Sequence, residues 1–596
     1  MSDVNIQNRN QSNGSPVQKT AVLDFYNQIP AKLRTYLEKF NLSTPQEMFD
    51  FLQPKLSTLE NPYKIDNCEK ASERLWNAFV NQETVLIYGD YDLDGTSGII
   101  LLYDSFKALG FQNLHYFQPS KANDGYGLHA HILERFKTEK NIDVVVTVDV
   151  GITGNAACDR AKDLGIDVIV TDHHLAQDEL PNAYTIVNPN QPGDQSGLGY
   201  LCGCGVGFYL VRGLCKKWIE KGSPVPLDLK SILPYFAVAT VTDMVPLVKD
   251  NRTLLKFAFE SFKNVTNLGF KTLLAELNLN SKKLDTSDIG LQLAPKINAI
   301  TRMSAALKPI DLFFKTSEAD AKAFAKDILK LNVERKQLQE AGLKEAKAAY
   351  EEYLKTNTVD SQDHHRVFFY ASENIHHGVT GLVASKMVDS FGGSFFIGAH
   401  STDTDVVVGS SRKPDHIQYS LVDLMAISKD SWIRFGGHAS AAGFEYLKSN
   451  EAAIWNGSKD FLTTAKSAST AAGAGGAIST NICIDPIALD WFDLNTHFFT
   501  WVQFLEPFGS HFPEPVFKLN KVPVLSVKVM KEKHFKLNVV NPHNREALNF
   551  VLFNSTEEQR QLLNSLNREL SICFKIKKDT FNYNQRFQFI IESIEA

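Results

Sequence analysis

Three separate apolar runs of the sequence are each followed closely by residues that can bind a metal ion. In chain order these are Asp90, Asp92 and Asp94, then Asp149, and then Asp172, His173 and His174. Crowded carboxylates repel one another, and a divalent cation offsets that cost. Oxygen and imidazole ligands without a thiolate favour manganese or magnesium over structural zinc. The residue types therefore predict a divalent metal site.

A fourth acidic candidate, Asp243, lies in a largely apolar helical stretch, where an unpaired carboxylate is costly. So many carboxylates suit two cations, which activate a water and stabilise the leaving oxygen of a phosphoryl transfer. Two alternatives stay open. In the first, the aspartates lie in a solvated loop and do no more than cap the following helix. In the second, two of them form a general-base pair that works without metal.

The elements that must position these side chains follow from alternating apolar runs and helical patterns. The expected strands are Val85–Tyr88, Leu114–Phe117, Val144–Val148, Val168–Val170 and Thr185–Val187. This alternation is typical of an α/β fold with a mostly parallel sheet covered on both faces. Ligands of such sheets bind beyond the carboxyl ends of the strands, so the fold brings the candidate residues to one edge.

The rest of the chain predicts further domains. Ser317 to Lys355 is charged and amphipathic, and we expect one connecting helix, the alternative being two helices with a kink at Gly342. A second, smaller α/β unit has expected strands at 367–370, 394–397 and 406–409. The tail alternates like a small OB-like β-barrel, with expected strands at 522–529, 535–540, 548–553, 571–576 and 587–591.

These patterns give seven expected segments. They are a disordered tail (1–20), a helical lead-in (21–78), the parallel-sheet domain (79–310), the connecting helix (311–358), the second α/β domain (359–464), a linker (465–480) and the OB-like domain (481–596).

Composition adds few constraints on function. The 596 residues are 43% hydrophobic and 22% charged, with a net charge of −6, so there is no global nucleic-acid signature. The seven cysteines fit neither a zinc site nor a disulfide framework, which favours a reducing cytosol. The polar N-terminus is unlike a signal peptide, and no apolar run reaches the roughly 20 residues that span a bilayer. We therefore expect a cytoplasmic protein.

The candidate residues resemble the four motifs of the DHH phosphoesterase superfamily. The motifs are Asp90-Tyr91-Asp92-Leu93-Asp94-Gly95, Asp149 with Gly151, Asp172-His173-His174, and Asp243. Gly436-Gly437-His438 resembles the glycine-rich element of the superfamily's second, DHHA1-type domain. The order of motifs along the chain, and the OB-like tail, are most similar to the RecJ family of single-stranded-DNA-specific exonucleases.

The resemblance implies roles for individual residues. The implied metal ligands are Asp90, Asp92, Asp94, Asp149, His173 and Asp243, with Asp149 bridging two Mn²⁺ or Mg²⁺ ions. The implied catalytic residues are His174, Asp172 and Asp149. His174 would contact the scissile phosphate or the attacking water, and Asp172 would orient a neighbouring imidazole. The implied phosphate-binding residues are Lys121, Asn298, Arg302, His376, Ser410, Arg412, Gly436, Gly437 and His438. Ser410 and Arg412 would clamp the 5′-phosphate.

Four positions depart from the family pattern. Lys121 and Lys296 stand where the family usually has Arg, Thr301 where it has Gly, and Ile375 where it has Trp. Lysine still binds phosphate but lacks the planar fork of arginine. The Ile375 replacement removes an expected stacking platform.

The resemblance also implies an activity. The expected enzyme is a metal-dependent 5′→3′ exonuclease on single-stranded DNA that releases 5′-mononucleotides in DNA repair and recombination. Its expected partners are single-stranded DNA and a single-stranded-DNA-binding protein or helicase, and the expected oligomeric state is a monomer. The alternatives are a phosphodiesterase acting on short oligonucleotides or nucleotides, and a non-catalytic replication-associated scaffold.

Three other features have simpler interpretations beside the functional ones. Asp363-His364-His365 repeats the tripeptide but is typical of a solvated loop, and Cys202 and Cys204 indicate close helix packing. Basic and aromatic residues in the tail predict a single-strand surface, the alternative being an ordinary hairpin. They are Lys528, Lys531, Lys533, His534, Phe535, Lys536, Lys575, Lys577, Lys578 and Phe581.

Overall fold

The computed structural model describes most of the chain. It describes residues 16–120, 124–177, 179–304, 306–356, 366–400, 405–417, 419–458, 484–530, 533–564, 570–578 and 587–595. Lys121, Asp363-His364-His365, the 465–480 linker, Lys531 and Phe581 lie outside these residues. The chain forms two compact units, one of residues 1–61, 246–257 and 482–596, the other of residues 62–245 and 258–481.

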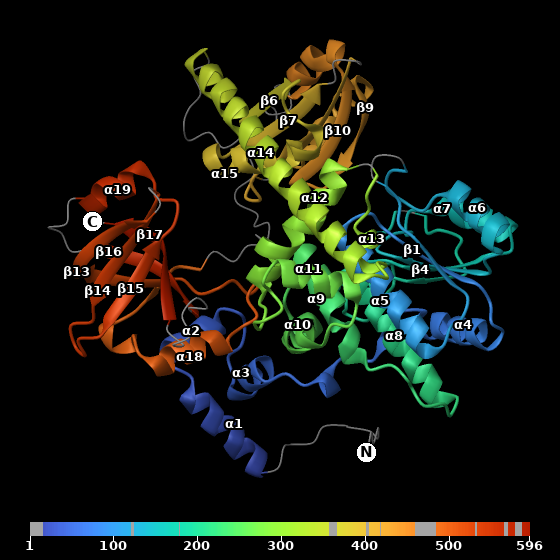
Figure 1. Ribbon diagram of the computed structural model, residues 1–596, viewed down its shortest axis with the longest axis horizontal. Coiled ribbons are helices and arrows are strands. Elements are labelled where there is room, and N and C mark those ends of the chain that lie inside the picture. The colour runs from blue at the N-terminus through green and yellow to red at the C-terminus, as the bar shows by residue number, and fades with distance from the viewer. Residues whose placement is uncertain are drawn as a thin grey trace. The chain divides into compact units, whose positions relative to one another are not determined.

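The larger unit contains a five-stranded parallel sheet, of which β1 and β4 are labelled in Figure 1. The strand order is β2-β1-β3-β4-β5. Its strands are β1 (Val85–Gly89), β2 (Leu114–Phe117), β3 (Val144–Val148), β4 (Asp167–Thr171) and β5 (Thr185–Val187). All five expected strands are confirmed. Every residue of β1 and β3 is buried, which explains why both are continuous apolar runs rather than alternating ones.

Helices cover both faces of this sheet. Leu86 and Val145 pack against α6 (Ala130–Lys140) and α7 (Asn155–Asp163) on one face. On the other face lie α5 (Leu93–Leu109) and α8 (Gly203–Glu220), and a Cβ on Gly98 of α5 would stand 2.4 Å from Cγ2 of Val148. The backbone of α5 therefore approaches β3 as closely as a glycine allows.

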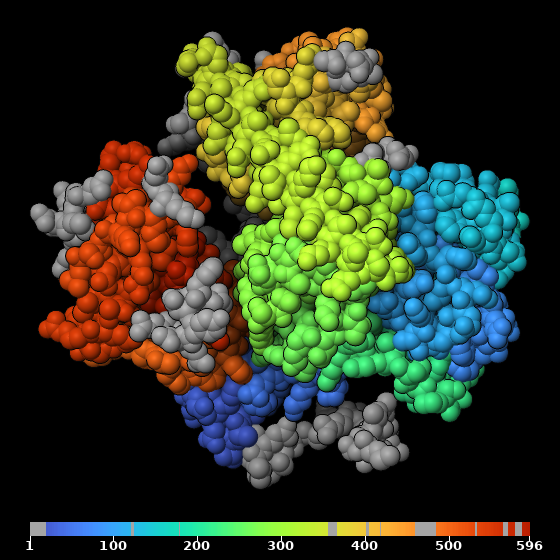
Figure 2. Space-filling view, in the orientation of Figure 1, coloured from blue at the N-terminus to red at the C-terminus, as the bar shows by residue number. Residues whose placement is uncertain are grey.

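Helix α4 (Cys68–Val80) precedes the sheet, and a series of helices follows it and leads into the connecting helix. The helices that follow are α9 (Leu233–Thr242), α11 (Leu268–Glu276), the π-helical turn η5 (Asp288–Leu293), α12 (Ala294–Met303) and α13 (Ile310–Phe313). Helix α14 (Glu318–Thr356) then runs for 39 residues without a break at Gly342, so the prediction of one helix is confirmed. One side of α14 is open to solvent along its length (Figure 2).

The second sheet of the larger unit has the order β6-β7-β8-β10-β9. Its elements are β6 (Val367–Ser372), η6 (His377–Val379), α15 (Thr380–Phe391), β7 (Ser394–His400), β8 (Val406–Arg412), α16 (Leu421–Ala426), β9 (Trp432–Gly437) and β10 (Ala441–Leu447). Only the β6–β7 pair is parallel. The three strands expected here are confirmed and extend further.

The smaller unit is built around a seven-stranded sheet in the order β11-β12-β16-β17-β15-β14-β13. The strands are β11 (Ile487–Ala488), β12 (Phe517–Val522), β13 (Val524–Met530), β14 (His534–Val540), β15 (Ala547–Leu552), β16 (Leu570–Lys578) and β17 (Phe587–Glu595). The expected single strand at 522–529 is wrong. Pro523 separates β12, which pairs with β16, from β13, which pairs with β14.

The N-terminal helices share a core with this C-terminal sheet. They are α1 (Pro16–Gln28), α2 (Ala31–Glu38) and α3 (Pro45–Leu52), and α1 begins inside the segment expected to be disordered. Leu33 and Leu37 join Phe498, Phe517 and other residues of the tail in one apolar cluster. The lead-in is thus divided, because α4 packs in the larger unit.

A buried arginine from the middle of the chain completes this core. Arg252, on α10 (Lys249–Ser261), donates to the carbonyl oxygens of Leu505 and Pro507 at 2.6 and 2.7 Å. Its guanidinium lies 3.9 Å from the ring centroid of Phe51 and 4.7 Å from that of Phe512. Three distant chain segments are therefore joined at one side chain. Over the described residues, no helix has both the length and the apolar character needed to cross a membrane.

Candidate metal centre and phosphate-binding residues

The first carboxylates are positioned by the start of helix α5. Asp92 is the N-cap residue of α5, and its Oδ1 accepts a hydrogen bond from the backbone N–H of Gly95 at 3.0 Å. The capping alternative is thus realised for Asp92, but it occupies only one carboxylate oxygen. A Cβ on Gly95 would meet the backbone of Asp90 at 2.5 Å, so glycine lets the loop fold tightly against the helix.

Asp94 joins two helices. Both of its oxygens accept backbone hydrogen bonds from the first residues of α8, from Gly203 at 2.7 Å and Cys204 at 2.8 Å. A Cβ on Gly203 would stand 2.4 Å from Cβ of Asp149, so only glycine permits this approach. The interpretation of the Cys202–Gly207 stretch as close helix packing is confirmed, and that packing also fixes Asp94.

Asp149 lies at the centre of the cluster. It follows β3 with a positive φ of 63°, and its Oδ1 is buried with no hydrogen-bond partner among the described residues. Nε2 of His173 is 3.2 Å from this oxygen. Oδ1 of Asp90 is also buried and unpartnered within the same described part of the chain. Buried, unpartnered carboxylate oxygens are costly unless a cation binds them.

The ligand atoms fall into three overlapping groups. Within each group the atoms lie within 4.8 Å of one another. The groups are Asp90, Asp92 and Asp149; Asp94, His173 and Asp243; and Asp149, His173 and His174. Asp149 and His173 each belong to two groups, so the geometry offers two neighbouring positions for cations.

The pKa values of the carboxyl groups show the electrostatic cost of this cluster. Burial, and then the charge of Asp92, raises the pKa of Asp90 to about 8 and that of Asp94 to about 7. Burial and the charge of Asp94 raise the pKa of Asp243 to about 8 and lift that of Asp149 well above its usual range. These carboxylates therefore lack compensating positive charge, and divalent cations would supply it.

The two histidines have opposite electrostatic environments. Nδ1 of His174 is 2.8 Å from Oδ1 of Asp172. Burial opposes charge on His174, but the hydrogen bond and charge of Asp172 outweigh it and raise its pKa to about 9. Burial and neighbouring His174 lower the pKa of His173 to about 4. A lowered pKa favours the neutral imidazole of His173, the form that binds a metal ion, whereas the contact with Asp172 favours the protonated form of His174, which suits a phosphate.

Three amide side chains that the sequence analysis gave no role hold this loop and the first motif. Nδ2 of Asn188 donates to the carbonyl of His174 at 2.9 Å, and Nδ2 of Asn190 donates to that of His173 at 2.6 Å. Buried Gln118 donates to the carbonyl of Asp90 at 2.9 Å. The position of Asn188 and Asn190 directly after β5, at the same sheet edge as the aspartates, was the available signal.

The second sheet and the helices before it contribute phosphate-binding candidates. Oγ1 of Thr380 donates to Oγ of Ser410 at 3.3 Å, and a Cβ on Gly381 would stand 3.1 Å from Nη2 of Arg412. Arg302, on α12, donates from Nη1 to the carbonyl of Gly378 at 3.3 Å. The structure therefore gathers Arg302, Ser410 and Arg412 around η6 and the first turn of α15.

The other expected phosphate contacts are spread around this region. Nδ1 of His376 accepts from the N–H of Gly378 at 3.1 Å, and Asn298 is half-buried on α12. Gly436, Gly437 and His438 are exposed at the β9–β10 turn, where Gly437 has φ 145°.

One residue of the expected single-strand surface is misassigned, and two of its lysines are paired. Phe535 is 4% exposed and packs in the core of the smaller unit, so it cannot stack on a base. Lys575 and Lys577 form ion pairs with Glu592 and Glu514. Ile375 is buried against α14, which agrees with the prediction that this position offers no stacking platform.

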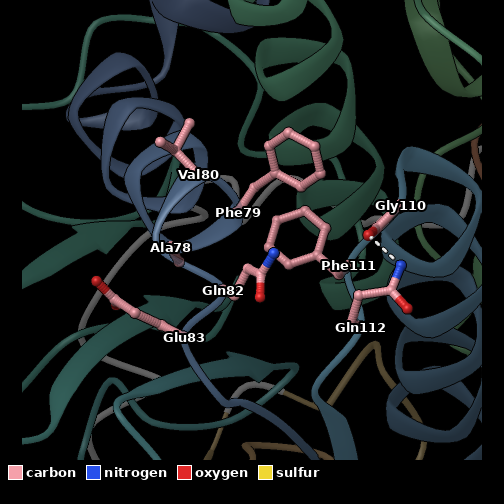
Figure 3. Close-up of a pocket in the computed structure, with 8 residues that line it drawn as sticks. All are labelled: Ala78, Phe79, Val80, Gln82, Glu83, Gly110, Phe111 and Gln112. Atoms are coloured by element: carbon pink, nitrogen blue, oxygen red, sulfur yellow. Dashed lines mark hydrogen bonds between the residues drawn. The ribbon is translucent and has the colours of Figure 1, made fainter.

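A surface pocket of about 240 Å³ lies away from the metal centre (Figure 3). Its lining residues precede β1 and β2, at the amino edge of the parallel sheet, and include Phe79, Phe111 and Gln112. Its one charged residue, Glu83, is paired with Arg74 at 2.6 Å. The carboxylate cluster is at the opposite, carboxyl edge, so the pocket is not the reactive site.

Comparison with known proteins agrees with this arrangement. The model of the DHH family, N-terminal domain, matches residues 84–239, and that of the RecJ OB domain matches residues 487–593. The single-stranded-DNA-specific exonuclease RecJ of Salmonella typhimurium is 28% identical over 575 residues, covering 95% of this chain and 97% of that protein. RecJ of Bacillus subtilis is 29% identical over 68% of this chain and 49% of its own length.

Solved structures give the same result. RecJ of Thermus thermophilus in complex with Mn²⁺ superimposes with a TM-score of 0.71 at 22% identity, covering 92% of this chain and 74% of that one. A manganese-bound exonuclease RecJ has a TM-score of 0.56 at 26% identity, covering 67% and 95%. The chain therefore contains a region that matches the DHH family, N-terminal domain, and a region that matches the RecJ OB domain, and it is similar to RecJ proteins along almost its whole length.

Proposed function

We propose that this protein is a metal-dependent exonuclease that hydrolyses single-stranded DNA in the 5′→3′ direction and releases 5′-mononucleotides. The observation that carries the proposal is the set of three ligand groups, each containing Asp149 or His173 and one containing both, beside the Asp172–His174 pair. Such a set suits hydrolysis of a phosphodiester. The relatives that match 95% of the chain are named single-stranded-DNA-specific exonucleases.

Each group of residues has a distinct task in this reaction. Asp90, Asp92, Asp94, Asp149, His173 and Asp243 would hold Mn²⁺ or Mg²⁺, in two neighbouring positions. When bound, the cations supply Lewis-acid stabilisation and an acidified water. The positive charge of His174, held by Asp172, faces the carboxylate edge, where it would bind a non-bridging oxygen of the scissile phosphate.

The second sheet would give the reaction its polarity. A guanidinium fork and a hydroxyl beside the start of α15 are suited to a terminal phosphate, and Ser410 and Arg412 provide them. A strand whose 5′-phosphate is held there would enter the metal centre from one end only. The expected cytoplasmic location, monomeric state and interaction with a single-stranded-DNA-binding protein or helicase stay predictions.

Hydrolysis of labelled strands tests the proposal. The full chain with Mn²⁺ is expected to release the label of a 5′-labelled single strand first, as a mononucleotide, and to leave a blunt duplex intact. Early release of a 3′ label would overturn the polarity. Faster turnover of a dinucleotide than of a long strand would instead indicate a phosphodiesterase of short oligonucleotides.

A further inference from the structure

Arg335 of helix α14 is a buried cation whose charge has no anionic partner among the described residues. It is 8% exposed, and its Nη1 and Nη2 donate to the uncharged side chains of Gln339 at 3.0 Å and Asn332 at 3.1 Å. Its Nε is buried without any hydrogen-bond acceptor in that same part of the chain. A buried guanidinium in this state is costly, and amide oxygens offset only part of that cost.

Helix α14 packs against α12, η6 and α15, which carry or border the phosphate-binding candidates. Asn332, Arg335, Gln339 and Gly342 lie on one face of α14, because they are three, four and three residues apart. A Cβ on Gly342 would stand 3.4 Å from Cγ2 of Val383 on α15. The face that carries Arg335 therefore packs toward η6 and α15.

Two other guanidiniums border the same segment. Arg302 donates to the carbonyl of Gly378 in η6, and Arg412 lies against Gly381 in the first turn of α15. Burial, followed by the positive charges of Arg335 and Arg412, lowers the pKa of Arg302 to about 10. We call Arg302, Arg335 and Arg412 the arginine cluster. None of the three is ion-paired with a carboxylate in the part of the chain that the structure describes.

We propose that Arg335 binds an internal phosphate of the single-stranded substrate, distinct from the terminal phosphate assigned to Ser410 and Arg412. The proposal rests on the exonuclease function proposed above. Three like charges gathered without a carboxylate repel one another, and phosphates of a nucleic acid strand would neutralise them. The fork geometry of arginine suits two oxygens of one phosphodiester.

The sequence gives no motif-based signal for this residue. Arg335 lies within a stretch of mixed charge that is typical of a solvated helix face, between Glu334 and Lys336. Only burial and the missing acceptor of Nε distinguish it from the other cations of α14.

Salt-dependent binding by the full chain with Mn²⁺ tests the proposal. The probe is a 5′-phosphorylated oligo(dT) whose first linkage is a neutral methylphosphonate, which the enzyme cannot hydrolyse. Loss of one phosphate contact in Arg335→Met should lower the slope of log affinity against log salt by about 0.7. Lys330→Met, which removes an exposed charge from the opposite face of α14, should leave the slope unchanged.

A second measurement locates the phosphate. Methylphosphonate is introduced at each further linkage in turn, and the affinity loss caused by Arg335→Met is measured on each strand. The loss should vanish at one internal linkage and persist at the others, because a neutral linkage has nothing for the guanidinium to bind. If Arg335→Met unfolds the protein, Arg335→Lys, which keeps a charge but not the fork, is scanned in the same way.

The outcomes separate the two proposals. An unchanged salt slope, together with an affinity loss that is equal on every strand, would show that Arg335 only supports the packing of α14. In that case a wild-type enzyme that still degrades single strands from the 5′ end keeps its proposed function. Failure of the wild type to bind or cut single strands would instead overturn the proposed function itself.

Discussion

Oδ1 of Asp172 accepts three hydrogen bonds, and two of them come from His174, from its backbone N–H at 3.1 Å and its Nδ1 at 2.8 Å. Oδ2 of the same carboxylate accepts from the backbone N–H of Ile152 at 2.9 Å. Asp172 is fully buried, yet these donors together lower its pKa despite the opposing effect of burial. The side chain therefore fixes both the loop and the charge of His174 without touching a reacting atom.

Replacing Asp172 by Asn should lower kcat by roughly 10- to 100-fold, as for other residues that orient a metal-site imidazole. N–H groups donate to both oxygens of Asp172, and an Asn side chain would place an NH₂ group, itself a donor, against one set of them. His174 would therefore lose its orientation and the negative charge that stabilises its protonated form. The expected signature is a fall in kcat while Mn²⁺ affinity changes less. A loss of Mn²⁺ binding that accounts for the whole effect would contradict an action through His174.

Asp149→Asn should abolish hydrolysis and remove most of the increase in melting temperature that Mn²⁺ causes in the wild type. Asn tolerates the positive φ of 63° better than Ala, so it is the cleaner substitution. Saturating Mn²⁺ should raise the melting temperature of the wild type by on the order of 5 °C, because the ion binds only the folded cluster. The variant should show little of this shift. Without metal, its melting temperature should be no lower than that of the metal-free wild type, because one of the carboxylates that repel one another is gone.

The control for this prediction is Asp104→Asn, because Asp104 is a half-buried carboxylate that accepts a hydrogen bond from the hydroxyl of Tyr235 at 2.8 Å, away from the cluster. It should keep the Mn²⁺-induced shift. An equal shift in Asp149→Asn and the wild type would remove Asp149 from the ligand set.

Arg412→Ala should reduce the preference for 5′-phosphorylated over 5′-hydroxyl strands by roughly tenfold or more, because a charge-assisted pair with phosphate is lost. Arg434→Ala is the matched control, since Arg434 is exposed in the same sheet and pairs with Glu445. Competition between the two kinds of strand measures the preference. A ratio that is unchanged in Arg412→Ala would show that the terminal phosphate is held elsewhere.

Lys528 and Lys536 stand directly opposite each other on β13 and β14, and neither pairs with a carboxylate within the described residues. Facing like charges destabilise a sheet unless an anion lies between them. Replacing both by Ser should weaken binding of long strands and lower its salt slope by about 1.4, at 0.7 per contact. Turnover of very short strands should be unchanged, and equal losses on both would argue against this surface.

The role of the C-terminal domain in binding could also be tested by deleting the chain after Ser479, but the two lysine substitutions are a better test. Leu33 and Leu37 of the N-terminal helices pack in the same core as Phe517 and Phe535. Removing the tail would expose this apolar surface, and loss of solubility would hide any effect on binding.

Local sequence patterns were enough to predict the long helix, the parallel sheet and the carboxylate and imidazole side chains that lie together at its edge. Val85–Tyr88 and Val144–Val148 are unbroken apolar runs because both faces of their strands are covered. A glycine-containing turn after each run marks the end of the strand in the sequence. The aspartates after these strands meet because carboxyl ends of parallel strands share an edge. One general rule of topology thus converts these patterns into a site.

Long-range packing alone settled which residues share a core and which charges lack a partner. Arg252 and the N-terminal helices join the C-terminal sheet across more than two hundred residues of chain, and no local pattern encodes such a pairing. The same holds for Arg335, which in the sequence is one cation among many on a charged helix. It becomes distinct only because packing removes water from its Nε and places no carboxylate beside it among the described residues.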